Sequence, residues 1–154
     1  PMGKEIERKF LVKDESYKKR ASRVIEIRQA YLSTSPDSVV RIRVSGPMAF
    51  LTVKSRTHGC ERGEWEYPIP VSDAIDIMDA CSCSAMISKT RYIVGRWEVD
   101  EFHGRLSGLT VAEIELQNAE EHFEKPAFLG REVTGDVRYY NSALTSCEEL
   151  PPTQ

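Results

Sequence analysis

The sequence predicts an α+β fold, mainly antiparallel β, with about eight strands closed into a barrel and short helices flanking it. Three observations favour this fold. Short runs of residues alternate polar and apolar side chains, which is the period of a β-strand. Gly, Pro, Asn and Asp residues separate these runs and mark turns. The regular alternation of strands with long helices that builds a parallel sheet is absent from the sequence.

The elements follow from these patterns in chain order. Strands are predicted at residues 3–12, 24–32, 38–44, 49–56, 64–67, 88–94, 95–102 and 111–116. Residues 14–23 form a loop or a short helix, and Ser72 is the predicted N-cap of a helix that reaches about residue 80. Residues 118–121 resemble a capping box for a short helix ended by Pro126, and Thr134 or Asp136 caps a final helix to residue 149.

The size of the chain favours one domain over residues 1–154, with residues 151–154 as a flexible tail. The formal net charge of −3 gives no reason to expect nucleic-acid binding. No apolar run approaches the roughly 20 residues of a membrane-spanning helix. No charged and then apolar leader precedes the first strand, so we expect a cytoplasmic protein. Its cysteines are expected to be reduced thiols: Cys60, Cys81, Cys83 and Cys147.

Charged side chains gather on one face of most predicted strands, opposite a face of aliphatic and aromatic residues. The basic members are Lys9, Arg41, Arg43, Lys54, Arg56, Lys89 and Arg91. The acidic members are Glu5, Glu7, Glu64, Glu66, Glu98, Asp100, Glu113 and Glu115. The barrel therefore has either an apolar core with a charged exterior, or a charged tunnel with an apolar exterior.

Two features favour the tunnel. Like charges stand about 7 Å apart on single strands, which costs free energy unless opposite charges or ions lie between them. Most strands also carry one sign of charge, whereas solubility alone would mix the signs. Clustered carboxylates suit a hard divalent cation, and clustered Arg and Lys side chains suit phosphate. Together they fit a complex of a metal with a polyphosphate.

The stretch Glu5-Ile6-Glu7-Arg8-Lys9 resembles the Glu-X-Glu-X-Lys motif of the triphosphate tunnel metalloenzymes, or CYTH superfamily. Further blocks in the same order extend the resemblance over nearly the whole chain, among them Arg41-Ile42-Arg43, Lys89-Thr90-Arg91-Tyr92 and Ala112-Glu113-Ile114-Glu115. The chain is most similar to the short bacterial single-domain branch, where several members are inorganic triphosphatases. The resemblance implies an eight-stranded antiparallel tunnel with a charged interior.

The resemblance also implies roles for individual residues. Glu5, Glu7, Glu113 and Glu115 would hold one or two Mg²⁺ or Mn²⁺ ions. The triphosphate would be bound by Lys9, Arg41, Arg43, Lys54, Lys89 and Arg91, with Arg56 and Asp100 as further candidates. Tyr31 matches a proposed proton acceptor, but it is as readily a packed tyrosine, and Lys89 is its rival. Glu64 and Glu66 would orient basic groups or water, or form structural salt bridges.

These roles imply metal-dependent hydrolysis of a phosphoanhydride bond, most simply that of inorganic tripolyphosphate to pyrophosphate and phosphate. The alternatives are a class IV adenylate cyclase, a thiamine triphosphatase and a polyphosphate-binding module without catalysis. The partner is then a small triphosphate, with no nucleic acid or membrane. Trp65, Tyr67 and Trp97 lie on apolar faces, where they line a homodimer contact or seat helices.

Overall fold

The computed structural model describes residues 3–154 and contains ten strands within them. The strands are β1 (Glu5–Val12), β2 (Arg23–Ser33), β3 (Ser38–Ser45), β4 (Met48–Ser55), β5 (Glu61–Arg62), β6 (Glu64–Ile69), β7 (Ile87–Val94), β8 (Trp97–Phe102), β9 (Thr110–Glu115) and β10 (Leu129–Glu132). The helices are α1 (Tyr17–Arg20), α2 (Val71–Ala80) and α3 (Asn141–Leu144), with 3₁₀ turns η1 (Gly104–Leu106) and η2 (Val137–Tyr139).

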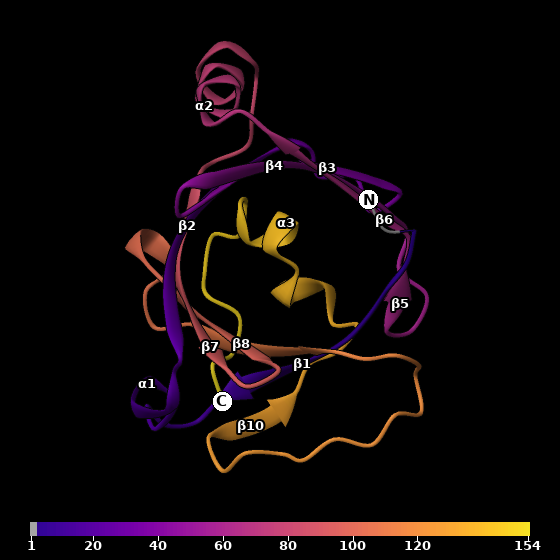
Figure 1. Cartoon of the computed structure of the whole chain (residues 1–154), viewed down its shortest axis with the longest axis vertical. Helices are drawn as coiled ribbons and strands as arrows, with labels where there is room; N and C mark the ends of the chain where they lie inside the picture. The colour runs from indigo at the N-terminus through magenta and orange to yellow at the C-terminus, as the bar shows by residue number, and fades with distance from the viewer. Residues whose placement is uncertain (1–2) are drawn as a thin grey trace.

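All strand pairs are antiparallel, and their order is β10-β1-β9-β8-β7-β2-β3-β4-β6. β5, which precedes β6 at one end of this order, pairs with β1 near the other end: Arg62 pairs with Glu5, and Glu61 pairs with Ile6. Gly63 alone separates β5 from β6, so one chain segment contacts both β4 and β1. The sheet therefore curls into the nearly closed antiparallel barrel seen as a ring in Figure 1. The predicted eight strands are present, and β5 and β10 are short additions.

The apolar side chains of the strands pack mostly on the outside of the barrel. Phe10, Trp97 and Ile114 pack with Phe128 beneath the segment that leads to β10. On β3 and β4, Ile42, Val44 and Ala49 pack against α2, which lies across the outside of the ring in Figure 1. The charged faces of the same strands consequently point inward, as the tunnel interpretation requires.

One part of the interior is apolar. Val39, Ile87 and Phe102 form a buried cluster with Tyr139 of η2 and Leu144 of α3. Figure 1 shows α3 inside the ring of strands. The C-terminal segment therefore closes one end of the barrel with apolar contacts and leaves polar residues facing the remaining interior.

Several predicted helices are wrong in extent. Helix α2 begins at Val71 after Pro70, one residue before the predicted cap Ser72. No helix forms at residues 118–126, although Asn118 and Glu121 accept backbone N–H groups at 3.0 and 2.6 Å, because these residues present no continuous apolar face.

The predicted C-terminal helix is divided. Tyr140 has an extended backbone (φ −66°, ψ 131°), and it separates η2 from α3. Asp136 caps only the first of these, by accepting the Arg138 N–H at 3.1 Å. The tail is not free either: Pro151 is buried and the Pro152 carbonyl accepts a hydrogen bond from the Tyr139 hydroxyl. Within residues 3–154, no helix has the length and apolar character to cross a membrane.

Candidate active site

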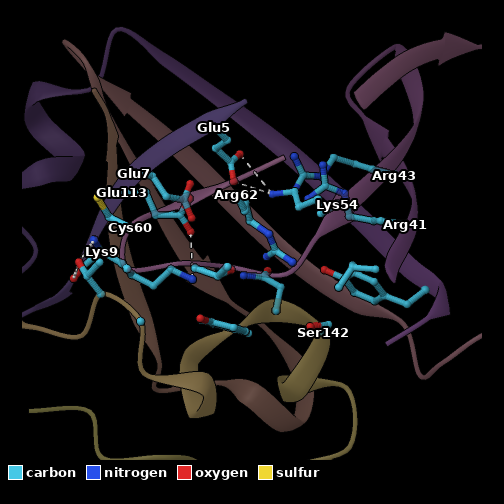
Figure 2. Close-up of a pocket in the computed structure, with 18 of the residues that line it drawn as sticks. Glu5, Glu7, Lys9, Arg41, Arg43, Lys54, Cys60, Arg62, Glu113 and Ser142 are labelled. Carbon is cyan, nitrogen blue, oxygen red and sulfur yellow. Dashed lines mark hydrogen bonds and ion pairs between the residues drawn. The ribbon is translucent and has the colours of Figure 1, made fainter. Parts of the chain in front are cut away.

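The interior of the barrel holds a polar cavity with about 730 Å³ of empty space, part of it open to solvent. Figure 2 shows Glu5, Glu7, Lys9, Arg41, Arg43, Lys54 and Glu113 pointing into it from the surrounding strands. A second hollow shares most of these residues and adds Glu64, Glu66, Glu98 and Glu115. The two hollows form one channel. The C-terminal segment lines one part of it, and an acidic group lines the other.

Two arginines of β3, the buried Arg41 and the half-buried Arg43, lack full partners. Arg43 donates from Nε to Gln29 Oε1 at 2.8 Å, and within residues 3–154 no carboxylate lies within salt-bridge distance of it. Burial, together with repulsion from Arg41 and Arg91, lowers the pKa of Arg43. The Nε atom of Arg41 is buried and has no hydrogen-bond partner in the described residues. This part of the cavity therefore carries unneutralised positive charge and free donors, which are the features of an anion site.

By contrast, Arg91 and Lys89 of β7 share one buried carboxylate. Asp100 accepts from Arg91 Nε at 2.7 Å and from Arg91 Nη2 at 2.9 Å, and Lys89 Nζ lies 2.6 Å from Asp100 Oδ2. These cations lower the pKa of Asp100 despite its burial. Burial, with repulsion from Arg91 and Arg43, lowers the pKa of Lys89 to about 7. Asp100 thus supports the cations from behind the cavity wall.

Carboxylates of the paired strands β1 and β9 lie side by side on one wall of the channel. Glu7 is the direct cross-strand partner of Glu115, and Glu113 is the partner of both Lys9 and Glu98. Lys9 Nζ lies 3.5 Å from Glu113 and lowers the pKa of Glu113 to about 2, although burial opposes this. No ion pair within residues 3–154 includes Glu7. Burial and the charges of Glu113 and Glu5 raise its pKa well above the usual range.

A lysine of β4 connects carboxylates of β1 and β6. Lys54 Nζ lies 3.1 Å from both Glu5 and Glu64, so it bridges the two carboxylates. Burial nevertheless raises the pKa of Glu5. Burial also raises the pKa of Glu115, and the neighbouring charges of Glu5 and Glu98 add to the effect. The acids at this part of the channel therefore outnumber the cations that neutralise them.

The acidic group has the chemistry of a divalent-metal site. Buried carboxylates with raised pKa values are stabilised when a hard cation takes the place of their protons. Within the described part of the chain, no three His, Cys, Asp or Glu side chains already form a closed ligand set. A bound ion would therefore draw Glu7 and Glu115 together, since within residues 3–154 neither of them has a cationic partner to give up.

Most of the predicted site residues come together. The cavity brings together Glu5, Glu7, Lys9, Tyr31, Arg41, Arg43, Lys54, Lys89, Arg91 and Glu113, and its acidic part adds Glu64, Glu66 and Glu115. Arg41 reaches Glu66 at 3.2 Å. Asp100 lies just behind them. The prediction for Arg56 is wrong in position: β4 ends at Ser55, so the alternation stops, and Arg56 is exposed and pairs with Asp37.

Several lining residues were not predicted from the sequence. They are Thr57, Gly59, Cys60, Arg62, Thr134, Gly135, Tyr140, Asn141 and Ser142. All of them lie in loops, in the two-residue strand β5 or in the C-terminal segment. Strand periodicity carries no information at such positions. The resemblance to the triphosphate tunnel metalloenzymes also covers two blocks of this segment, but it implied no role for their residues. The blocks are Glu132-Val133-Thr134 and Arg138-Tyr139-Tyr140-Asn141-Ser142.

Comparisons with known proteins agree with this geometry. The chain is 46% identical over 147 residues to an inorganic triphosphatase of Acetivibrio thermocellus, covering 93% of this chain and 94% of that protein. It is 37% identical over 149 residues to an inorganic triphosphatase of Nitrosomonas europaea, covering 91% and 95%.

Solved structures show the same architecture. A crystal structure of an inorganic triphosphatase superposes with a TM-score of 0.66 at 34% identity, over 94% of this chain and 96% of that one. A Hippeastrum protein, described as a candidate adenylyl cyclase with a dominant triphosphatase activity, shares the fold with a TM-score of 0.56 at 16% identity, over 75% and 81%. The model of the CYTH domain matches residues 3–141, which include all ten strands in the described part of the chain. The chain therefore belongs to the CYTH domain family.

Proposed function

We propose that this protein hydrolyses a terminal phosphoanhydride bond of inorganic tripolyphosphate, yielding pyrophosphate and phosphate, with the help of Mg²⁺ or Mn²⁺. The observation that carries the proposal is the separation of charge inside one channel. Arg43 has no carboxylate partner in the described residues, and Arg41 keeps a buried Nε without a partner beside its contact with Glu66. Across the channel from them stands Glu7, a carboxylate without a cationic partner in the described residues. A polyphosphate bound to a divalent cation is complementary to both sets.

In this proposal, the basic residues bind and orient the phosphate chain. Arg43 uses its Nε for Gln29, and Arg41 uses one Nη atom for Thr52 and Glu66, so each guanidinium keeps further N–H groups for phosphate oxygens. Lys89 and Arg91 are held rigidly by Asp100, so their remaining donors keep fixed directions. Preorganised cations of this kind stabilise the negative charge that builds up on the oxygens during phosphoryl transfer.

Glu5, Glu7, Glu113 and Glu115 would hold the metal ions. A bound Mg²⁺ or Mn²⁺ supplies charge neutralisation and a water of lowered pKa. One or two ions would occupy this site. Glu5, Glu7 and Glu115, whose pKa values are raised, would bind the ion in their ionised form. Two ligands would also exchange contacts, since Glu5 now contacts Lys54 and Glu113 contacts Lys9.

The reaction we propose is direct attack of water on the terminal phosphorus, with formation of a P–O bond, cleavage of the P–O–P bridge and loss of a proton from the water. Tyr31 and Lys89 both line the cavity, so both remain candidates to receive that proton. Lys89 can act as a base only in its neutral form, which its lowered pKa makes accessible near pH 7.

Tripolyphosphate is favoured over other triphosphates because both relatives of 46% and 37% identity are named inorganic triphosphatases. Thiamine triphosphate and ATP, the latter cleaved or cyclised as in a class IV adenylate cyclase, are the alternative substrates. A polyphosphate-binding module is the alternative without catalysis.

One experiment separates these functions. The purified protein is incubated with tripolyphosphate, ATP or thiamine triphosphate, with Mg²⁺, with Mn²⁺ or with EDTA, and the products are separated by ion-exchange chromatography. We expect pyrophosphate and phosphate from tripolyphosphate only when metal is present. Cyclic AMP, thiamine diphosphate, or tight binding without product would each replace the proposal by the corresponding alternative.

A cytoplasmic location and a homodimer remain predictions. Trp97 is buried against Phe10 and Phe123 and so seats the outer segment of the chain, whereas Trp65 and Tyr67 are exposed. A homodimer contact through the predicted aromatic residues would therefore use Trp65 and Tyr67 of β6. Sedimentation velocity at micromolar concentration tests it, and a single monomeric species would refute it.

A further inference from the structure

Two carboxamides connect the C-terminal segment to the cations of the cavity. Gln29 of β2 is fully buried, and Asn141 is the first residue of α3. Asn141 Oδ1 lies 2.9 Å from Lys89 Nζ and 3.0 Å from Gln29 Nε2. Gln29 in turn bonds Arg43 and the Tyr31 hydroxyl. One chain of hydrogen bonds thus runs from Lys89 to Arg43.

The direction of every bond in this chain is fixed by its two ends. The Arg43 guanidinium and the Lys89 ammonium in its charged form donate only, so the atom of Gln29 that faces Arg43 and the atom of Asn141 that faces Lys89 must be oxygens. The Gln29 nitrogen must then face Asn141 and Tyr31. Since the Tyr31 oxygen accepts this N–H at 3.0 Å, its own hydrogen points elsewhere. The amide orientations therefore follow from chemistry alone.

The same bonds restrict Lys89. Its ammonium has three N–H groups. One bonds Asp100 at 2.6 Å and another bonds Asn141 at 2.9 Å. Lys89 also lines the cavity. Asp100 and Asn141 together leave one N–H to point away from both of them, and this N–H is the group that can reach a phosphate oxygen.

We propose that Asn141 is a positioning residue of the active site, whose side-chain oxygen fixes the directions in which Lys89 and, through Gln29, Tyr31 and Arg43 present their groups to the substrate. The inference rests on the proposed function and deepens it, because it makes α3 part of the phosphate-binding machinery. It differs from two simpler roles: Asn141 as a packing residue that holds α3 in the barrel, and Asn141 as a direct donor to phosphate.

Two substitutions of similar size distinguish these roles. Asn141→Asp keeps the accepting oxygen but replaces the NH₂ group with a negatively charged oxygen, which repels phosphate. Asn141→Leu keeps the volume but removes the acceptor. If Asn141 positions Lys89, Asn141→Leu lowers kcat for tripolyphosphate about 10- to 100-fold with little change in KM, because the donors are misdirected. Asn141→Asp then retains clearly more kcat than Asn141→Leu.

The opposite order identifies a different role. If Asn141 donates directly to phosphate, Asn141→Asp is the more damaged variant and its KM rises. If Asn141 only packs α3, Asn141→Leu keeps wild-type kcat while its melting temperature matches that of the wild type. Either result overturns the proposal. Asn118→Leu, in an exposed turn outside the channel, is the matched control and should keep wild-type kcat and KM.

A double substitution tests the connection through Gln29. Gln29→Leu breaks the same chain of hydrogen bonds one step away. In a shared network, the kcat of Gln29→Leu/Asn141→Leu is only slightly below that of the worse single variant, whereas independent sites give the product of the two losses. Independent losses would overturn the network. Failure of the proposed function gives a distinct result: the wild-type protein then releases no phosphate from tripolyphosphate with either metal.

Discussion

Glu7 of β1 stands directly opposite Glu115 of β9, so two carboxylates that point into the channel are cross-strand neighbours. Like charges in this position destabilise a sheet by up to about 1 kcal/mol. Burial and the neighbouring carboxylates raise the pKa values of both side chains. The fold thus retains a repulsive contact that a bound cation would relieve, which leads to the first prediction.

Glu7→Gln should stabilise the metal-free protein by about 1 kcal/mol, because it removes one of two opposed charges. The same variant should lose Mn²⁺ binding and tripolyphosphate hydrolysis. Thermal melts with EDTA and with Mn²⁺ measure both effects, since ligand binding to the folded state raises the melting temperature. Glu124→Gln, at an exposed position, is the control. A Glu7→Gln protein that is still stabilised by Mn²⁺ would remove Glu7 from the metal site.

Arg43 and Arg91 should respond differently to the same substitution. Arg91→Met leaves the buried Asp100 with Lys89 alone, and breaking a buried ion pair costs about 3 kcal/mol of stability. Arg43→Met breaks no ion pair and should cost much less stability, yet it should lower kcat/KM for tripolyphosphate about 100-fold. Urea denaturation and steady-state kinetics test this contrast. Equal losses of stability would contradict the account of Arg43 as an unpaired cation.

Lys89 should take up protons when tripolyphosphate binds. Its pKa of about 7 leaves much of it neutral at pH 8, and a bound anion raises that pKa again. Titration calorimetry with EDTA at pH 8, in buffers of different ionisation enthalpy, should show net proton uptake. Lys89→Met should lack this uptake, whereas Lys13→Met, at an exposed position, should retain it. Uptake of the same size in Lys89→Met would assign the proton to another group.

Binding of Mn²⁺ should release protons, in contrast to the proton uptake expected when tripolyphosphate binds. The raised pKa of Glu7 means that part of its population holds a proton below neutral pH, and a metal ion displaces that proton. Calorimetry at pH 6 should therefore show proton release, and affinity for Mn²⁺ should rise with pH. Glu7→Gln should abolish both. A pH-independent affinity between pH 5 and 7 would show that the ligands are already ionised.

Arg56 and Arg62 test whether an arginine must line the cavity to contribute to substrate binding. Arg62 lines the cavity and lies 5.9 Å from the ring of Tyr140, whereas Arg56 is exposed and pairs with Asp37. Arg62→Ala should raise KM for tripolyphosphate several-fold, by about 1 kcal/mol of lost binding. Arg56→Ala should leave KM and kcat unchanged. An effect of Arg56→Ala equal to that of Arg62→Ala would mean that the loop holding Arg56 folds onto the substrate.

The strands and their inward faces could be predicted because alternation is a local property of the sequence. Glu5, Glu7, Lys9, Arg41 and Arg43 all lie where the period of two places them. The same rule failed at Arg56, because the strand ends one residue earlier. Asn141 could not be found this way: it sits on a four-residue helix, and its contacts with Lys89 and Gln29 depend on how the C-terminal segment enters the barrel.

The pairing of β1 has a consequence for folding kinetics. Its pairing partners β9 and β10 lie near the other end of the sequence. The Lys9 N–H donates to Thr134 Oγ1, 125 residues away. Contacts at such separation slow folding, since a long loop must close before they form. Until then, Ile6 and Phe10 expose apolar surface that promotes aggregation. The same event that buries this surface brings Glu7 next to Glu115, so catalytic competence and protection from aggregation are acquired together.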